Sequence, residues 1–140
     1  MARLTPRMKN WLEGSGAHIG TATRAGLPTV VVVDSATVVG DDHVRFVLSP
    51  KQVEHVRKNI EENPQVAFGP GGLGSIRAAY QFKGKAELDG QALDVLIEEV
   101  YCTKPGPEAA LRLDTLPHDA LVQFETSRWK DQGPPTRKAE

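Results

Sequence analysis

The segment Val44–Pro64, VRFVLSPKQVEHVRKNIEENP, combines a short strand pattern with a sharply defined helix start. Ser49 can act as the N-cap, and Pro50 suits the first helical position because its missing N–H is not needed there. Gln52 lies where a capping-box side chain reaches back to the backbone amide of the N-cap. Pro64 ends the predicted helix, since proline disfavours helical backbone in the preceding residue. The segment therefore predicts a strand that leads directly into a helix.

The first turn of this helix is the best anion-binding geometry in the sequence, because unpaired backbone amides and partial positive charge meet there. Lys51, His55 and Lys58 lie on the polar face of the helix. Val53 and Val56 begin the opposite, apolar face. In most proteins such a polar stripe is ordinary solvated surface, so both interpretations stay open.

The composition is typical of one domain without disulfides. The chain has 140 residues and a net charge of −1, so no overall field steers it to nucleic acid or to an anionic membrane. The single cysteine, Cys102, excludes an intramolecular disulfide, and the four histidines show no close ligand spacing, so we expect no metal site. The longest apolar run, Val30–Val33, is too short to span a bilayer, and the polar start resembles no signal peptide. We expect a cytoplasmic protein with one domain over residues 1–130 and a disordered tail over 131–140.

Two β-prone runs near the amino terminus predict a hairpin. His18–Thr23 and Leu27–Thr37 flank a short connection that contains Gly26, where positive φ is available. The second run contains the four consecutive valines Val30–Val33. A run without alternation predicts a strand that is covered on both faces, at the centre of a barrel or at an interface between subunits.

The second half of the chain has one clear alternating pattern and two weaker ones. Ile76–Leu88 alternates between apolar and polar residues, which predicts a long strand after the glycine-rich turn Gly69–Ser75. A helix is predicted after Asp89, its N-cap, because apolar residues follow at helical spacing: Leu93, Leu96, Ile97, Val100 and Tyr101. Ala120–Trp129 is interpreted as a last strand.

A short amphipathic helix, with Thr5 as N-cap and Met8, Trp11 and Leu12 on one face, precedes these elements. The predicted order is helix, hairpin, strand, helix, strand, long strand, helix, strand. Six strands with mostly short connections and few helices indicate a mainly β fold, a small closed or split β-barrel with flanking helices.

Three segments carry a resemblance to a known family. They are HIGTATRAGLPTVVVV (18–33), VRFVLSPKQVEHVRKNIEENPQVAF (44–68) with its N-I-x-x-N-P-x-V ending, and YQFKGKAEL (80–88). In this order and at this spacing the chain resembles the pyridoxamine 5'-phosphate oxidase-like, FMN-binding split-barrel superfamily over about Met8–Trp129. The resemblance implies a homodimer of six-stranded split barrels with two flavin sites at the subunit interface.

The resemblance also implies residues that hold the FMN phosphate. The positions that match the family's loop and helix start are Ser49, Lys51, Gln52, His55 and Val56. The family's basic pair falls on His55 and Val56, and valine cannot pair with phosphate. Lys51, His55 or Arg57 would therefore substitute. On the second strand this chain supplies only Thr29 as a polar residue before its valines.

Other cofactor contacts are implied by the long strand and the carboxyl end. The family's flavin-contacting amide aligns near Ala79, which cannot replace it, and Arg77 and Gln81 lie on the same face. Trp129 would approach the cofactor from the partner chain. The missing substrate-binding elements weigh against a true pyridoxamine-phosphate oxidase.

The leading hypothesis is a dimeric FMN-binding protein, a flavin-dependent oxidoreductase that acts on a small-molecule substrate or electron donor. No side chain is an obvious proton donor, so no catalytic residue is assigned. The alternatives are a non-enzymatic carrier of flavin, deazaflavin or haem, and a dimeric barrel that has lost its cofactor.

Overall fold

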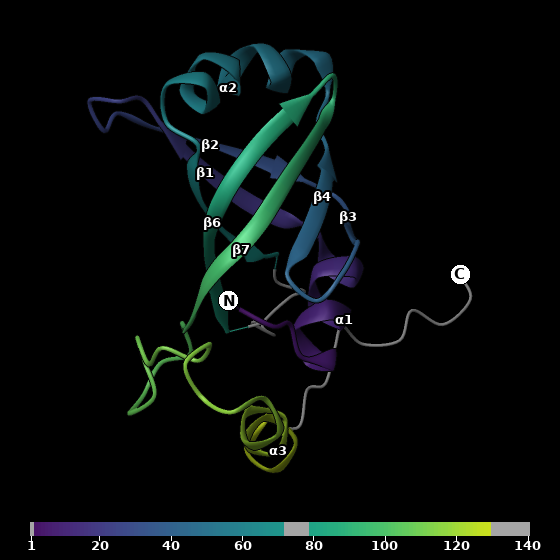
Figure 1. Ribbon diagram of the computed structural model, residues 1–140, viewed down its shortest axis with the longest axis vertical. Coiled ribbons are helices and arrows are strands. Elements are labelled where there is room, and N and C mark those ends of the chain that lie inside the picture. The colour runs from purple at the N-terminus through teal and green to yellow at the C-terminus, as the bar shows by residue number, and fades with distance from the viewer. Residues whose placement is uncertain (1, 72–78, 130–140) are drawn as a thin grey trace.

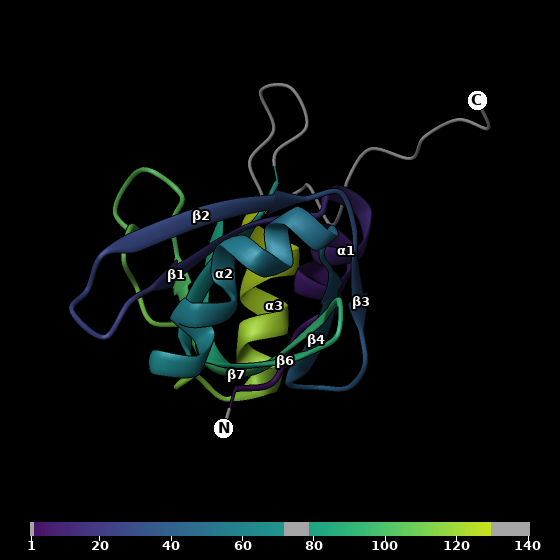
Figure 2. The same cartoon turned by 90° about the horizontal axis from the view of Figure 1, so that it is seen from above.

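The structure is a computed structural model that describes residues 2–71 and 79–129. An antiparallel sheet of seven strands curls around the core, in the order β2-β1-β5-β6-β7-β4-β3, and three helices lie against it (Figures 1 and 2). The elements are α1 (Pro6–Ser15), β1 (Ala17–Ala22), β2 (Pro28–Val33), β3 (Ala36–Val38), β4 (His43–Val47), α2 (Pro50–Glu62), β5 (Gln65–Pro70), β6 (Tyr80–Asp89), β7 (Ala92–Cys102) and α3 (His118–Arg128).

The two edges of the sheet are joined by a very short connection. β2 is one edge and β3 is the other, yet only Asp34 and Ser35 separate them in the chain. Two residues cannot cross a flat seven-stranded sheet, so the sheet must curl until these edges meet at one corner. The expected split barrel is confirmed, with seven strands in the described part of the chain rather than six. The predicted strand 27–37 bends at this corner into two strands, and a further strand gained at Ala92–Cys102 offsets one lost at 120–129.

The core fills the inside of the curl. Phe68 packs edge-on against Phe46, with ring centroids 5.1 Å apart, and stacks on Phe82 at 5.0 Å. From α1, Met8 and Trp11 enter the same core and are fully buried. The amphipathic helix predicted at the amino terminus is confirmed, with Thr5 as its N-cap.

The helix start predicted from Val44–Pro64 is confirmed in detail. The Ser49 hydroxyl accepts a hydrogen bond from the Gln52 amide, and the Gln52 side chain accepts one from the Ser49 amide. The buried Asn59 donates to the Thr21 hydroxyl at 3.0 Å, which ties α2 to β1. In Figure 1, α2 lies across one end of the barrel.

The prediction of a helix after Asp89 is wrong. This segment is β7, joined to β6 by the two-residue turn at Gly90. Glu99 pairs with Lys83 but Ile97 pairs with Gly84, so Glu98 is an extra residue and forms a bulge. The bulge shifts the alternation of buried residues, which are Leu93, Val95 and Ile97 before it and Val100 and Cys102 after it. Three of them, at 93, 97 and 100, have the spacing of a helix.

The strand predicted at Ala120–Trp129 is also wrong, because this segment forms α3. Its inward positions are Leu121 and Glu125, followed by Trp129 at the C-cap, a spacing of four residues. The middle one is a carboxylate, so the apolar pattern that would indicate a helix is interrupted.

The strand β2 is covered on one face only within this chain. Val31 and Val33 are buried, whereas Val30 is 62% exposed and Val32 is 54% exposed. The prediction of a strand at the barrel centre is therefore wrong, because β2 is an edge strand. The alternative of a subunit interface concerns a second copy and stays a prediction.

The long alternating strand is confirmed as β6, which begins at Tyr80. Ile76–Ala78 lie outside the described residues, as does the part 72–75 of the predicted glycine-rich turn and the tail 131–140. Gly69 and Pro70 belong to β5. Among the described residues, no helix is long and apolar enough to cross a membrane.

The segment that follows β7 folds back on it through Asp114. The Asp114 carboxylate accepts hydrogen bonds from the Val100 amide at 2.9 Å and from Arg112 Nε at 3.0 Å. Burial raises the pKa of the Asp114 carboxyl, but these hydrogen bonds outweigh burial and the net pKa lies below its ordinary value.

This shift predicts a loss of stability in acid. Because the folded pKa is lowered, the contribution of Asp114 is present above the pKa of an unfolded aspartate, about 3.9, and is lost as the pH falls through the folded pKa. We expect Asp114→Asn to cost about 1 kcal/mol at pH 7 and to have a smaller effect as the pH approaches the folded pKa. Urea unfolding of both proteins from pH 7 to pH 3 measures this, and a difference that stays constant with pH would contradict it.

Candidate functional site

A pocket of about 410 Å³ lies at the corner where the two edges of the sheet meet. It is formed by the end of β2, the connection to β3, the end of β4 and the start of α2. Its lining residues are Val32, Val33, Asp34, Ser35, Val47, Ser49 and Gln52. The side-chain amide nitrogen of Gln52, Nε2, donates a hydrogen bond to the Val32 carbonyl at 2.7 Å. This bond fixes the start of α2 against β2.

The polar groups of this pocket can donate and accept hydrogen bonds, but part of their capacity is used within the fold. Pro50 has no N–H, and the backbone N–H of Gln52 already donates to the Ser49 hydroxyl. The capping box therefore leaves fewer free donors for an anion than an uncapped helix start. Asp34 adds a carboxylate to the lining, which disfavours a second negative charge nearby.

Two of the predicted basic residues, Lys51 and His55, lie on α2 outside the lining of this pocket. Lys51 and His55 are exposed on α2, within a few residues of Ser49 and Gln52. Among residues 2–71 and 79–129, no basic side chain lines the pocket itself. The structure thus brings Ser49 and Gln52 together in the lining, whereas Lys51 and His55 are exposed on the first turns of α2.

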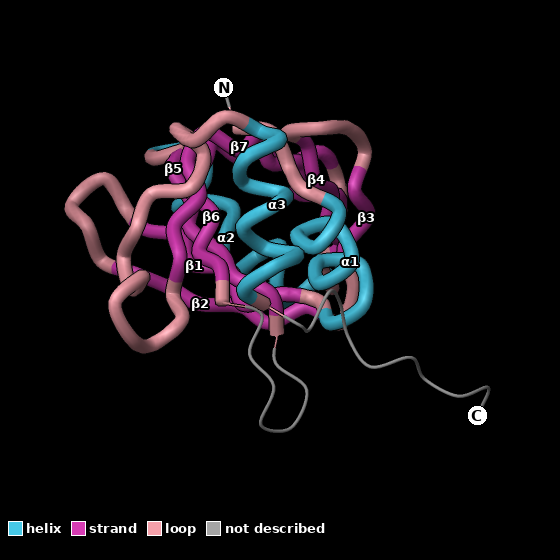
Figure 3. The backbone as a smooth tube through the Cα atoms, turned by 90° about the horizontal axis from the view of Figure 1, so that it is seen from below, coloured by secondary structure: helices cyan, strands magenta, loops and turns pink. Residues whose placement is uncertain are grey.

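The other predicted cofactor residues lie apart from this pocket within the chain. Thr29 is half-buried in β2, and its carbonyl accepts from the Thr21 hydroxyl at 3.4 Å. Arg57 lines a different pocket, near the other end of α2. Trp129 is buried beside α3, which Figures 1 and 3 show with α1 at the end of the molecule opposite α2. Arg77 lies outside the described residues.

The rim of the pocket is apolar and exposed. Val32 and Val47 line it and expose 54% and 66% of their surface, and Val30 is exposed next along the same face of β2. The two valines offer a flat apolar group a surface to cover, while Ser49, Gln52 and Asp34 of the same lining offer hydrogen bonds.

A buried ionisable cluster lies at the opposite end and was missed by the sequence analysis. Glu125 accepts hydrogen bonds from the Thr5 hydroxyl at 3.0 Å and from the Tyr80 hydroxyl. The Arg7 guanidinium lies over the rings of Tyr80 and Trp129, 5.0 and 4.6 Å from their centroids. The only signal was the position of Arg7 beside the apolar face of its helix.

Burial dominates the electrostatics of this cluster. It raises the pKa of Glu125, against the opposing effects of the two hydroxyl donors and the Arg7 charge. Burial also raises the pKa of Tyr80, and the Glu125 charge adds to that increase. Because these groups bond to one another, we assign the cluster to the docking of α1 on α3.

Cys102 and the metal-ligating residue types offer no further site in the described ranges. Burial raises the pKa of the Cys102 thiol, which favours its unreactive protonated form. No group of three His, Cys, Asp or Glu side chains in residues 2–71 and 79–129 is placed to hold a metal ion.

Comparisons with known proteins connect this fold to a family. No protein-family model matches the chain. The uncharacterized protein MJ0282 of Methanocaldococcus jannaschii is 30% identical over 124 residues, which cover 87% of this chain and 76% of that protein.

Three solved structures share the fold at low sequence identity. A candidate pyridoxamine 5'-phosphate oxidase from Lactobacillus delbrueckii has a TM-score of 0.59 at 22% identity, over 71% of this chain and 94% of its own. An FMN-binding protein from Syntrophomonas wolfei has a TM-score of 0.55 at 12% identity, over 71% and 83%. The haem storage protein HutZ from Vibrio cholerae has a TM-score of 0.50 at 16% identity, over 71% and 94%.

Proposed function

The chain belongs to the pyridoxamine 5'-phosphate oxidase-like, FMN-binding split-barrel superfamily, and from that premise we propose that it binds FMN at the pocket between β2, β4 and the start of α2. The observation that carries the proposal is the composition of this pocket. An exposed apolar rim stands next to hydroxyl and amide groups at a helix start. A flavin matches this composition, because its planar ring can cover the apolar rim and the hydroxyls of its ribityl chain can bond to the polar groups.

The fit to FMN is good for the ring and the ribityl chain and depends on two flexible side chains for the phosphate. Val32 and Val47 can cover the ring, and Ser49 and Gln52 can bond to the chain hydroxyls. Lys51 and His55 are exposed on the same helix within a few residues of Ser49 and Gln52 in the chain, so they are the groups that would neutralise the phosphate. Asp34 limits how deep the phosphate can lie.

A second copy of the chain completes the proposed site. Val30 and Val32 lie on the uncovered face of the edge strand β2, and burying them in a homodimer would remove apolar surface from water. The resemblance also implies a contact from the partner's Trp129, but Trp129 is buried against Arg7 and Tyr80 in its own chain, so we leave it out of the proposed site. The bound flavin would supply hydride or electron chemistry, and the protein would position the ring and exclude water.

The proposal is tested by titrating the purified protein with FMN and with riboflavin, which lacks the phosphate. We expect FMN to bind more tightly. The double variant Lys51→Ala/His55→Ala should lose at least about 10-fold in FMN affinity, because two charge-assisted contacts are removed. Its riboflavin affinity should not change. The matched control Glu54→Ala/Lys58→Ala alters two exposed α2 residues outside the pocket and should bind FMN normally.

The outcomes separate the alternatives. Unchanged FMN affinity in the double variant would show that the phosphate lies elsewhere. A protein that takes up no FMN but gains a Soret band with haemin would be a haem binder, as HutZ is by name. A protein that takes up a deazaflavin but neither FMN nor haemin would have the deazaflavin as its cofactor. A protein that takes up none of the three would be a cofactor-free barrel. Turnover of reduced nicotinamide with an electron acceptor distinguishes an oxidoreductase from a carrier.

A further inference from the structure

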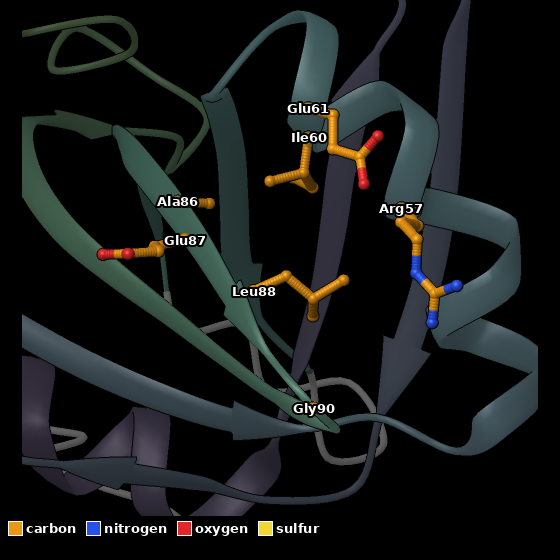
Figure 4. Close-up of a pocket in the computed structure, with 7 residues that line it drawn as sticks. All are labelled: Arg57, Ile60, Glu61, Ala86, Glu87, Leu88 and Gly90. Atoms are coloured by element: carbon orange, nitrogen blue, oxygen red, sulfur yellow. The ribbon is translucent and has the colours of Figure 1, made fainter.

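A second pocket, of about 330 Å³, lies between the carboxyl-terminal half of α2 and the end of β6 (Figure 4). Its lining residues are Arg57, Ile60 and Glu61 of α2 and Ala86, Glu87, Leu88 and Gly90 of β6 and the following turn. The three helix positions are spaced i, i+3 and i+4, so they share one face of α2. The volume is near the lower limit for small-molecule sites, which indicates a small ligand.

The floor of this pocket is apolar. Ile60 and Ala86 each expose only 7% of their surface, and Leu88 packs against the core beside them. Figure 4 shows the Ile60 and Leu88 side chains extending into the space between the helix and the strand. Gly90 leaves the pocket open at the turn, because a side chain there would meet nothing within 4 Å.

One positive and one negative group stand at the rim of this floor. In Figure 4, Arg57 and Glu61 project from α2 beside the apolar residues, whereas the Glu87 carboxylate points away from them. Within the described ranges neither Arg57 nor Glu61 forms an ion pair or a hydrogen bond through its side chain. By contrast, Lys58 and Glu62, one position further on, are paired at 3.7 Å.

We propose that this pocket binds a small α-amino acid with a branched apolar side chain. The Arg57 guanidinium can take the carboxylate through two parallel hydrogen bonds, and the Glu61 carboxylate can take the ammonium group. The side chain of the ligand covers the floor. A simple carboxylic acid would meet Glu61 and a simple amine would meet Arg57, so only a ligand with both charges matches both groups.

The test is a titration of the ¹⁵N-labelled protein with L-leucine, followed by backbone amide shifts. We expect saturable shifts at Gly90 and along the second half of α2, with a Kd of about 1 mM, as suits an open site and a ligand of few atoms. Isoamylamine lacks the carboxylate, 4-methylpentanoate lacks the ammonium group, and glycine lacks the apolar side chain. Each should bind at least about 5-fold more weakly.

Two charge variants with matched controls locate the site. Arg57→Gln and Glu61→Gln should each weaken leucine binding by about 10-fold, since each removes one charge-assisted contact. Lys58→Gln and Glu54→Gln alter neighbouring exposed charges on α2 and should leave leucine binding unchanged. All four changes are on the helix surface, so the fold is preserved. Absence of saturable shifts, shifts centred elsewhere, or equal binding of 4-methylpentanoate would each overturn the proposal.

Discussion

Replacing Glu125 with alanine is expected to lower the free energy of unfolding by about 3–5 kcal/mol. Glu125 is 1% exposed and accepts hydrogen bonds from the hydroxyls of Thr5 and Tyr80, and Arg7, also 1% exposed, lies close enough to lower its pKa. Without the carboxylate, a buried guanidinium loses its counter-charge and two buried hydroxyls lose their acceptor. Urea unfolding at pH 7 measures the difference.

Two further variants separate the buried charge from ordinary surface effects. Glu125→Gln keeps an acceptor for both hydroxyls and should cost less than alanine at the same position. Glu98→Ala removes a carboxylate from an exposed pair with Lys85, whose charged atoms are 4.0 Å apart, and should cost less than about 1 kcal/mol. If Glu125→Ala and Glu98→Ala destabilised the protein equally, the cluster would not hold α1 on α3.

Gly84→Ala is expected to destabilise the protein by about 3 kcal/mol or more, with loss of folded protein as its extreme. A Cβ at Gly84 would lie 2.0 Å from the Leu96 carbonyl oxygen and 2.9 Å from its carbon. Both are backbone atoms of β7, so no side-chain rotation relieves the overlap. The close approach is produced by the bulge at Glu98 in the longest strand pair.

Gly40→Ala is the matched control for this substitution. A Cβ at Gly40 meets nothing within 4 Å, so the free energy of unfolding should change by less than about 1 kcal/mol. Thermal unfolding and the fraction of soluble protein report both variants. A Gly84→Ala protein as stable as Gly40→Ala would show that β6 and β7 can separate at the bulge without cost.

Local signals in the sequence predicted the helix starts at Thr5 and Ser49 correctly, because an N-cap residue followed by proline is a pattern of two neighbouring residues. Patterns that depend on long-range pairing were misleading. β7 looked helical because its bulge arises only when β6 pairs with it. α3 was hidden because its buried Glu125 is compensated by residues far away in the chain.

The residues of the candidate site also fall into two groups, those predicted from a local pattern and those that reach the pocket only through the fold. Ser49 and Gln52 were predicted as site residues from a local pattern, and both line the candidate pocket. Asp34 also lines the candidate pocket but was not predicted as a site residue, since it reaches the pocket only when the sheet curls. Arg57 follows Ser49 by two turns of helix and therefore lies at another pocket, which the sequence alone does not reveal.

The two-residue connection at Asp34 and Ser35 gives the first pocket a mechanical role. β2 and β4 form opposite walls of that pocket, but they share no ladder hydrogen bonds, because they are separated in the sheet by β1, β5, β6 and β7. A molecule that bound to both walls would link β2 to β4, two strands of the barrel that are not paired with each other. A ligand that binds only the folded state would raise the free energy of unfolding with its concentration, so the stability of the barrel would depend on how fully the pocket is occupied.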